Sequence, residues 1–141
     1  MIKNVYEILD EVAAAKDNES RKAILYYNNN YALRQVLKAA FDPKIKFVIT
    51  KVPYYKPNDA PVGLSETTLH KEANRLYLFE EGNPGVSPNL SQERKEQLLV
   101  QILESIEAKE AVVLTNALLK NLKVPGLNKK IVEEVFPDLL K

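Results

Sequence analysis

Three residues near the end of the chain have the types and spacing needed to bind an anion. Asn128 is a favourable helix N-cap, and Lys129 and Lys130 follow it as the first two residues of a predicted helix. The positive end of the helix macrodipole disfavours cations there by about 0.3–1 kcal/mol. A phosphate would relieve that penalty, because it could bind the free backbone N–H groups and both ammonium groups, with Lys123 close by in the sequence. The other interpretation, that the lysines only keep a surface turn in solution, stays open at this point.

Residue types that usually carry catalysis or hold a metal are scarce in the 141 residues. The chain has no Cys and a single His, His70, so disulfides, cysteine nucleophiles and thiolate zinc sites are excluded. A catalytic triad or metal site based on histidine would depend on His70 alone. No phosphate-binding loop of the GxxxxGK[ST] type occurs. We therefore expect a protein that is not an enzyme and holds no cofactor or metal. If it were an enzyme, Tyr26, Tyr27 and Tyr31 would be the side chains to consider.

Positive charge is concentrated in one part of the chain, although the formal net charge is only +1. Residues 21–56 hold eight Lys or Arg against one acidic residue, and residues 57–110 hold five against ten. Such asymmetry is typical of a surface that binds a polyanion, provided that the cations meet in space. The cations expected at this surface are Arg34, Lys38, Lys44, Lys46, Lys51 and Lys56 from the first stretch and Lys120, Lys123, Lys129 and Lys130 from residues 120–130, which we call the late turn.

The spacing of apolar residues predicts an all-α fold that positions these cations. We expect a single domain over residues 1–141, built as a bundle of about six or seven helices. Residues 44–62 are expected to be extended and irregular, because the apolar alternation at their start has no second strand to pair with and three prolines follow. Residues 136–140 are expected to pack onto the bundle as an apolar plug. The helices are predicted near residues 4–15, 19–28, 33–41, 65–81, 91–106, 112–122 and from 129 onward.

The N-terminus has charged residues where a signal peptide would be apolar. No apolar run is long enough to span a membrane. We therefore expect a soluble, cytoplasmic protein without a membrane partner.

Residues 122–140, with the sequence LKVPGLNKKIVEEVFPDLL, resemble the end of the N-terminal DNA-binding domain of ATP-dependent DNA ligases from tailed phages of the myovirus type. Three earlier segments, residues 8–13, 21–25 and 33–37, follow the order and spacing of the opening helices of that domain. The resemblance implies a small all-α domain that lies across the minor groove and holds duplex DNA by its sugar-phosphate backbone. In that family a separate domain carries out the chemistry, and this chain has no Lys-x-Asp-Gly motif to accept an adenylyl group.

Matched to that family residue by residue, the late turn would supply the contacts to the DNA backbone. The chain departs from the family's pattern at Pro125, which precedes the turn glycine, and at Phe136, where the family has tryptophan. It also has Glu133 and Glu134 where the family is more basic or neutral. The residues that the resemblance implies as backbone contacts are Lys123, Gly126, Asn128, Lys129 and Lys130.

The function expected from the sequence is therefore non-catalytic, sequence-nonspecific binding of double-stranded DNA through its phosphate backbone and minor groove. The protein would be an accessory to phage DNA replication or repair in the cytoplasm of the infected host cell. The alternative is a protein–protein adaptor or inhibitor that reuses the fold, without DNA binding, to bind a phage replication protein or a host protein. The near-neutral net charge and the acidic residues 57–110 favour this alternative.

Overall fold

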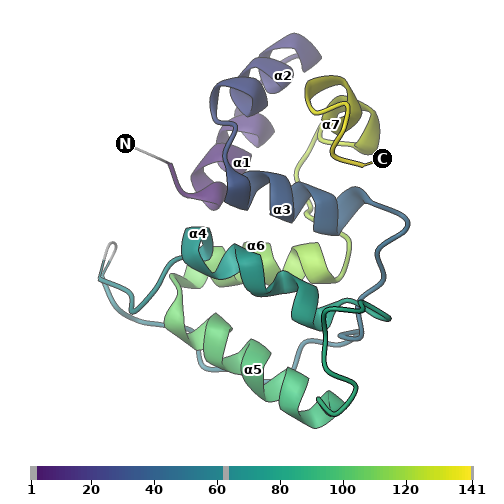
Figure 1. Ribbon diagram of the computed structural model, residues 1–141. Coiled ribbons are helices and arrows are strands. Elements are labelled where there is room, and N and C mark those ends of the chain that lie inside the picture. Colours follow the sequence, from purple (N-terminus) through teal and green to yellow (C-terminus); the bar gives the residue numbers. More distant parts are fainter. Residues whose placement is uncertain (1–2, 62–63, 141) are drawn as a thin grey trace.

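The computed structural model describes residues 3–61 and 64–140. Every regular element within these residues is a helix, which confirms the predicted all-α fold class. In chain order the helices are α1 (Val5–Ala14), α2 (Asn18–Tyr27), α3 (Tyr31–Phe41), α4 (Leu69–Glu72), the 3-10 helix η1 (Ala73–Phe79), α5 (Gln92–Ser105), α6 (Ala108–Leu118) and α7 (Lys129–Val135). α3 lies across the middle of the molecule, with α1, α2 and α7 on one side and α4, α6 and α5 on the other (Figure 1).

Side-chain caps set the starts of several helices. Asn128 Oδ1 accepts a hydrogen bond from the backbone N–H of Ile131 at the start of α7 (3.0 Å). Ser91 Oγ accepts from the N–H three residues further on, at the start of α5 (3.1 Å). Before α1, the N–H of Asn4 donates to Glu7 Oε1 (3.1 Å). The sequence predicted these starts because a cap joins residues only three positions apart.

The helix predicted over residues 65–81 is shorter and of two kinds. α4 begins at Leu69, after the N-cap Thr68, and continues as η1 from Ala73. The buried residues of η1 are Ala73, Leu76 and Phe79. Their spacing of three fits a 3-10 helix, which has three residues per turn. The apolar pattern that predicted one long α-helix therefore belongs in part to a tighter helix.

The segment that follows α3 is irregular, as predicted, over residues 44–61; residue 62 lies outside the described residues. An isolated bridge joins Phe47 to Glu80 at the end of η1. Phe47 is buried there, so the segment contributes to the core without forming a sheet.

The same segment then runs along α5. Val48 O accepts a hydrogen bond from Gln92 Nε2 (3.0 Å), and the N–H of Lys56 donates to Glu104 Oε2 (2.7 Å). Gln92 and Glu104 lie near the two ends of α5. The part of the segment between Val48 and Lys56 is therefore held beside that helix.

The core lies on both sides of α3. Leu33 and Leu37 of α3 and Leu114 of α6 are fully buried. After α7, Phe136 is buried and Leu139 packs against the core, so residues 136–140, which we call the C-terminal turn, dock onto the bundle as predicted.

The helices in residues 3–61 and 64–140 are short, and the longest that is described, α5, has 14 residues. None of them has the length and apolar character that crossing a bilayer requires.

Candidate nucleic-acid interface

The late turn between α6 and α7 contains two lysines with positive φ. α6 ends in a Schellman arrangement, in which Lys120 (φ 59°) donates its N–H to Ala117 O (3.0 Å) and Asn121 donates to Asn116 O (2.9 Å). Lys123 has φ 58°, and its N–H donates to Asn121 Oδ1 (3.2 Å). A positive φ is usual for glycine and uncommon for lysine. The contacts of the two lysine side chains therefore show whether they hold the turn or are free to bind an anion.

The amine of Lys120 is occupied inside the protein. Its Nζ donates to Ala39 O (2.9 Å) and Asp42 O (2.8 Å) at the C-terminal end of α3, and lies 5.6 Å from the centre of the Phe47 ring. Burial lowers the pKa of Lys120, against the attraction of Asp42 and Glu80. A cation is favourable at this end of a helix. Lys120 therefore caps α3, and we correct its predicted role as an anion contact.

Gly126 is favoured by the backbone conformation of a turn and by the Arg21 side chain that packs against it. Leu127 N–H donates to Val124 O (3.2 Å), and Gly126 has φ 80°. Pro125 in the second position and glycine in the third are the pattern of a type II turn. A Cβ on Gly126 would overlap Nε of Arg21. The turn and the neighbouring Arg21 of α2 therefore account for a glycine at position 126, which the family resemblance implied as a contact to the DNA backbone.

Sequence reasoning did not find Arg21 as a residue that positions the late turn. Its guanidinium donates to Ala15 O after α1 (3.0 Å) and to Asn18 Oδ1 at the start of α2 (2.7 Å). Its Nε is buried and has no hydrogen-bond partner among the described residues. Arg21 joins α1, α2 and the late turn. No sequence signal relates it to Gly126, because the two residues lie far apart in the chain.

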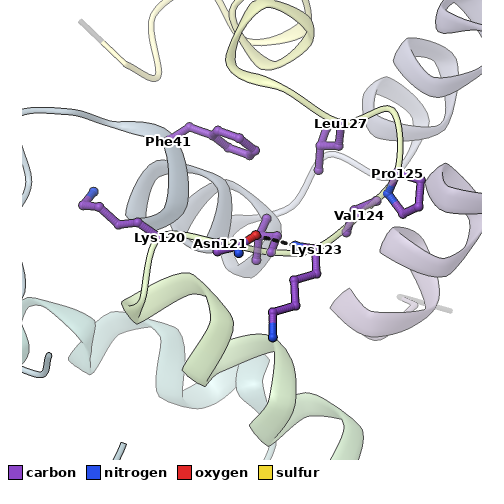
Figure 2. A pocket seen from close by; sticks show the side chains of 8 residues that line it. Phe41, Lys120, Asn121, Lys123, Val124, Pro125 and Leu127 are labelled. Atoms are coloured by element: carbon purple, nitrogen blue, oxygen red, sulfur yellow. Dashed lines mark hydrogen bonds between the residues drawn. The ribbon is translucent and has the colours of Figure 1, made fainter. Parts of the chain in front are cut away.

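A hollow of about 370 Å³ separates the late turn from the end of α3 (Figure 2). Phe41 extends from α3 across it toward Leu127. Lys120 and Lys123 extend in different directions, Lys120 past the end of α3 and Lys123 toward α6. The two amines therefore do not converge on one anion in this hollow.

The start of α7 has the predicted arrangement. Asn128 is the N-cap, and Lys129 and Lys130 are the first two helical residues, both exposed. Neither amine has an ion pair or hydrogen bond with any described residue. The pKa of Glu134 is held below its usual range mainly by Lys22, with a smaller contribution from Lys130. Because α7 has only seven residues, the exposed amines rather than the dipole would attract a phosphate.

Arg34 and Lys38 lie one turn apart on α3 and border a groove of about 380 Å³. The opposite wall is the end of α7 and the C-terminal turn, including Asp138. Neither cationic side chain forms a hydrogen bond or an ion pair within residues 3–61 and 64–140. The amide side chains of Asn29 and Gln35 also line the groove. Two unpaired cations and two amides can together hold phosphate oxygens.

The remaining predicted cations of residues 21–56 are divided between two places. Lys44 and Lys46 follow directly after α3. Lys51 and Lys56 lie on the segment held beside α5, at the opposite end of the molecule from α7 (Figure 1). The structure therefore does not gather all ten predicted cations into one cluster.

Six of the predicted cations belong to α3, to the residues directly after it, or to the first turn of α7. The start of α7 is separated from the groove on α3 by the length of α7, which is about 10 Å. We call this set the cationic surface: Arg34, Lys38, Lys44, Lys46, Lys129 and Lys130.

Comparison with known proteins relates most of the chain to one family. A model described as a family of unknown function (DUF6433) matches residues 8–124, from α1 into the late turn. The matched part includes α3 with Arg34 and Lys38, and it ends before Asn128. No curated protein matches the chain.

Proposed function

The chain belongs to the DUF6433 family, and because the function of that family is unknown, we propose from the cationic surface that the protein binds double-stranded DNA through the phosphate backbone. The binding is non-catalytic and independent of base sequence. The resemblance of residues 122–140 to the DNA-binding domain of phage DNA ligases supports the same ligand. It also supports a role as an accessory to phage DNA replication or repair.

The observation that carries the proposal is that the cations of this surface have no partner within the described residues and that two of them, Arg34 and Lys38, border one groove. Within the described residues, none of their six side chains forms an ion pair or a hydrogen bond. Ion pairs elsewhere within the described residues involve only Lys3, Lys22 and Arg75, so a missing ion pair does not by itself set the cationic surface apart. What sets it apart is that Arg34 and Lys38 border the same groove, one helical turn apart. Unpaired cations gathered around α3 and α7 raise the local potential and attract a polyanion even though the net charge is near zero.

The groove on α3 is the expected centre of the contact. It combines Arg34, whose guanidinium can hold a phosphate through two hydrogen bonds, with Lys38 one helical turn away. Like charges at this spacing repel, so a phosphate between them would be stabilising. Lys129 and Lys130 would contact the backbone further along the duplex, which explains why cations are tolerated at the start of α7.

The proposal is tested by fluorescence anisotropy with two labelled duplexes of about 20 base pairs and unrelated sequence, titrated with protein at several salt concentrations. We expect equal affinity for both sequences. With four to six phosphate contacts, the logarithm of the binding constant should fall against the logarithm of salt concentration with a slope of about −4 to −5. No binding at low salt, or a flat response to salt, would overturn the proposal.

A pair of charge-reversal variants locates the contact. Arg34→Glu with Lys38→Glu should weaken binding strongly, whereas Lys51→Glu with Lys56→Glu should have a much smaller effect. Both double variants change the net charge by the same amount, so the comparison separates a local contact from a general charge effect. Equal losses from the two would exclude the groove on α3 as the centre of binding.

A further inference from the structure

Three tyrosines at the corner between α2 and α3 are unusually exposed. The exposed fractions are 65% for Tyr26, 81% for Tyr27 and 48% for Tyr31. The rings of Tyr26 and Tyr27 meet edge to face, with centroids 5.4 Å apart and planes at 81°. Their hydroxyl groups have no hydrogen-bond partner in the described parts of the chain. The corner therefore presents aromatic surface that nothing within these residues covers.

Tyr26 and Tyr27 border a hollow of about 410 Å³ between α2 and α7, which we call the tyrosine groove. Val135 and Pro137 line this groove, and the same two residues line the groove that contains Arg34. The two grooves are therefore neighbours on either side of the junction between α7 and the C-terminal turn. A flexible polymer bound in one of them can reach the other.

The charges of the two grooves differ. In the tyrosine groove, Lys22 Nζ pairs with Glu134 and also with Glu19 (3.2 Å), so the cation is neutralised and carboxylate is in excess. Across the junction, Arg34 and Lys38 have no ion pair or side-chain hydrogen bond with any residue that the structure describes. Phosphates are therefore favoured on the α3 side, and uncharged flat groups are favoured beside the tyrosines.

Unpaired DNA bases have the chemistry that this pair of grooves fits. Every base has a flat face that stacks on an aromatic ring, whatever its identity, while its backbone phosphate requires a cation. The exocyclic amines of bases can also donate hydrogen bonds to carboxylates such as Glu19 and Glu134. Bases in an intact duplex are stacked on each other and cannot enter the groove, so the ligand must contain a single-stranded part.

We propose that the tyrosine groove stacks unpaired bases of a DNA strand whose phosphates lie on Arg34 and Lys38, so that the preferred ligand is a duplex with a single-stranded tail. This inference rests on the proposed function, because it places the duplex on the cationic surface. Tyr26 and Tyr27 are the stacking residues. Charge complementarity and the shared wall of the two grooves carry the assignment.

The test compares the affinity of the full chain for three labelled probes at one salt concentration. The probes are a blunt duplex of about 20 base pairs, the same duplex with a tail of about six thymidines, and a longer blunt duplex with the same number of phosphates as the tailed one. Stacking of one or two bases should make the tailed duplex bind roughly tenfold more tightly than either blunt duplex.

Variants assign that preference to the groove. Tyr26→Ala with Tyr27→Ala should lower the ratio of tailed to blunt affinity to about one, whereas Tyr26→Phe with Tyr27→Phe should keep it, because stacking uses the ring and not the hydroxyl group. Tyr54→Ala is the matched control, since Tyr54 is 91% exposed on the segment beside α5 and should leave the ratio unchanged. Circular dichroism verifies that each variant is folded.

The outcomes separate this inference from the proposed function. Binding of blunt duplex without any preference for the tail would overturn the inference alone and would leave the tyrosine groove to a protein partner. A preference that survives in the double alanine variant, or that is lost equally in Tyr54→Ala, would also overturn it. Failure to bind either blunt duplex, together with tyrosine-dependent binding of the tailed duplex, would overturn the proposed function and keep the stacking assignment.

Discussion

Replacing Gly126 with alanine should destabilise the protein and leave its surface charge unchanged. The residue has φ 80° at the third position of the turn, and a Cβ there would overlap Nε and Cζ of Arg21. Arg21 cannot move away freely, because its guanidinium donates to Ala15 O and Asn18 Oδ1. The substitution therefore strains the turn and displaces a side chain that joins three elements.

The size of the effect follows from these contacts. A left-handed conformation costs an alanine about 1–2 kcal/mol. Displacing Arg21 from the half-buried carbonyl of Ala15 costs about 1–2 kcal/mol more, because a charged donor is lost. The smaller conformational freedom of alanine in the unfolded chain returns about 0.5 kcal/mol. We expect the free energy of unfolding to fall by about 1.5–3.5 kcal/mol in total.

The assay is urea denaturation followed by circular dichroism for the wild type, Gly126→Ala, Arg21→Ala and the double variant. In the Arg21→Ala background, Gly126→Ala should cost only about 1 kcal/mol, because the strain of the turn is then the sole remaining penalty. The coupling between the two residues is therefore expected to be about 1–2 kcal/mol. At a temperature where Gly126→Ala is folded, its DNA affinity should stay within about twofold of the wild type.

Two results would refute this reasoning. An equal loss of stability in both backgrounds would mean that Arg21 yields without cost and that packing does not explain the glycine. A stable Gly126→Ala variant with strongly reduced DNA affinity would mean that the glycine serves close approach of the DNA backbone, as the family resemblance implies.

Two further predictions concern residues with unusual environments. Burial raises the pKa of Glu110, and Glu107 acts in the same direction against the hydrogen bond from Leu69 N–H, so the ionised carboxylate destabilises the fold. Glu110→Gln should therefore raise the free energy of unfolding at pH 7. That gain should vanish below the ordinary pKa of 4.5, where Glu110 is protonated in both the folded and the unfolded wild type. Urea denaturation of wild type and variant at several pH values between 3 and 8 measures it. Lys120→Met should lower the free energy of unfolding by about 1–3 kcal/mol in urea denaturation, because two carbonyls at the end of α3 lose a charged donor; an unchanged stability would contradict its role as a cap.

The elements and caps that sequence reasoning predicted depend on local interactions. The N-cap Asn128 and its partner Ile131 are three residues apart, and the buried stripe of α3 repeats within each helical turn. Such features are written in neighbouring residues, so a pattern reveals them. The helix over 65–81 was predicted too long, because an apolar spacing of three to four residues does not distinguish an α-helix from a 3-10 helix.

The candidate site was predictable only as a list of cations. The sequence identified Arg34, Lys38, Lys129 and Lys130, which are unpaired within the described residues. It could not tell them from Lys120, whose amine bonds to carbonyls 81 and 78 residues away. A hydrogen bond over that separation leaves no trace in the spacing of residues.

The amino-acid sequence by itself determined the helical class, the caps and the concentration of positive charge, because these depend on residue type and on neighbours within one turn. The tertiary structure decided the rest. It assigned Lys120 to α3 and Gly126 to Arg21, moved Lys51 and Lys56 to the far end of the molecule, and brought the exposed tyrosines beside the groove of Arg34. Packing between distant segments fixes which charges are neutralised and which surfaces adjoin, and only the folded chain brings those segments together.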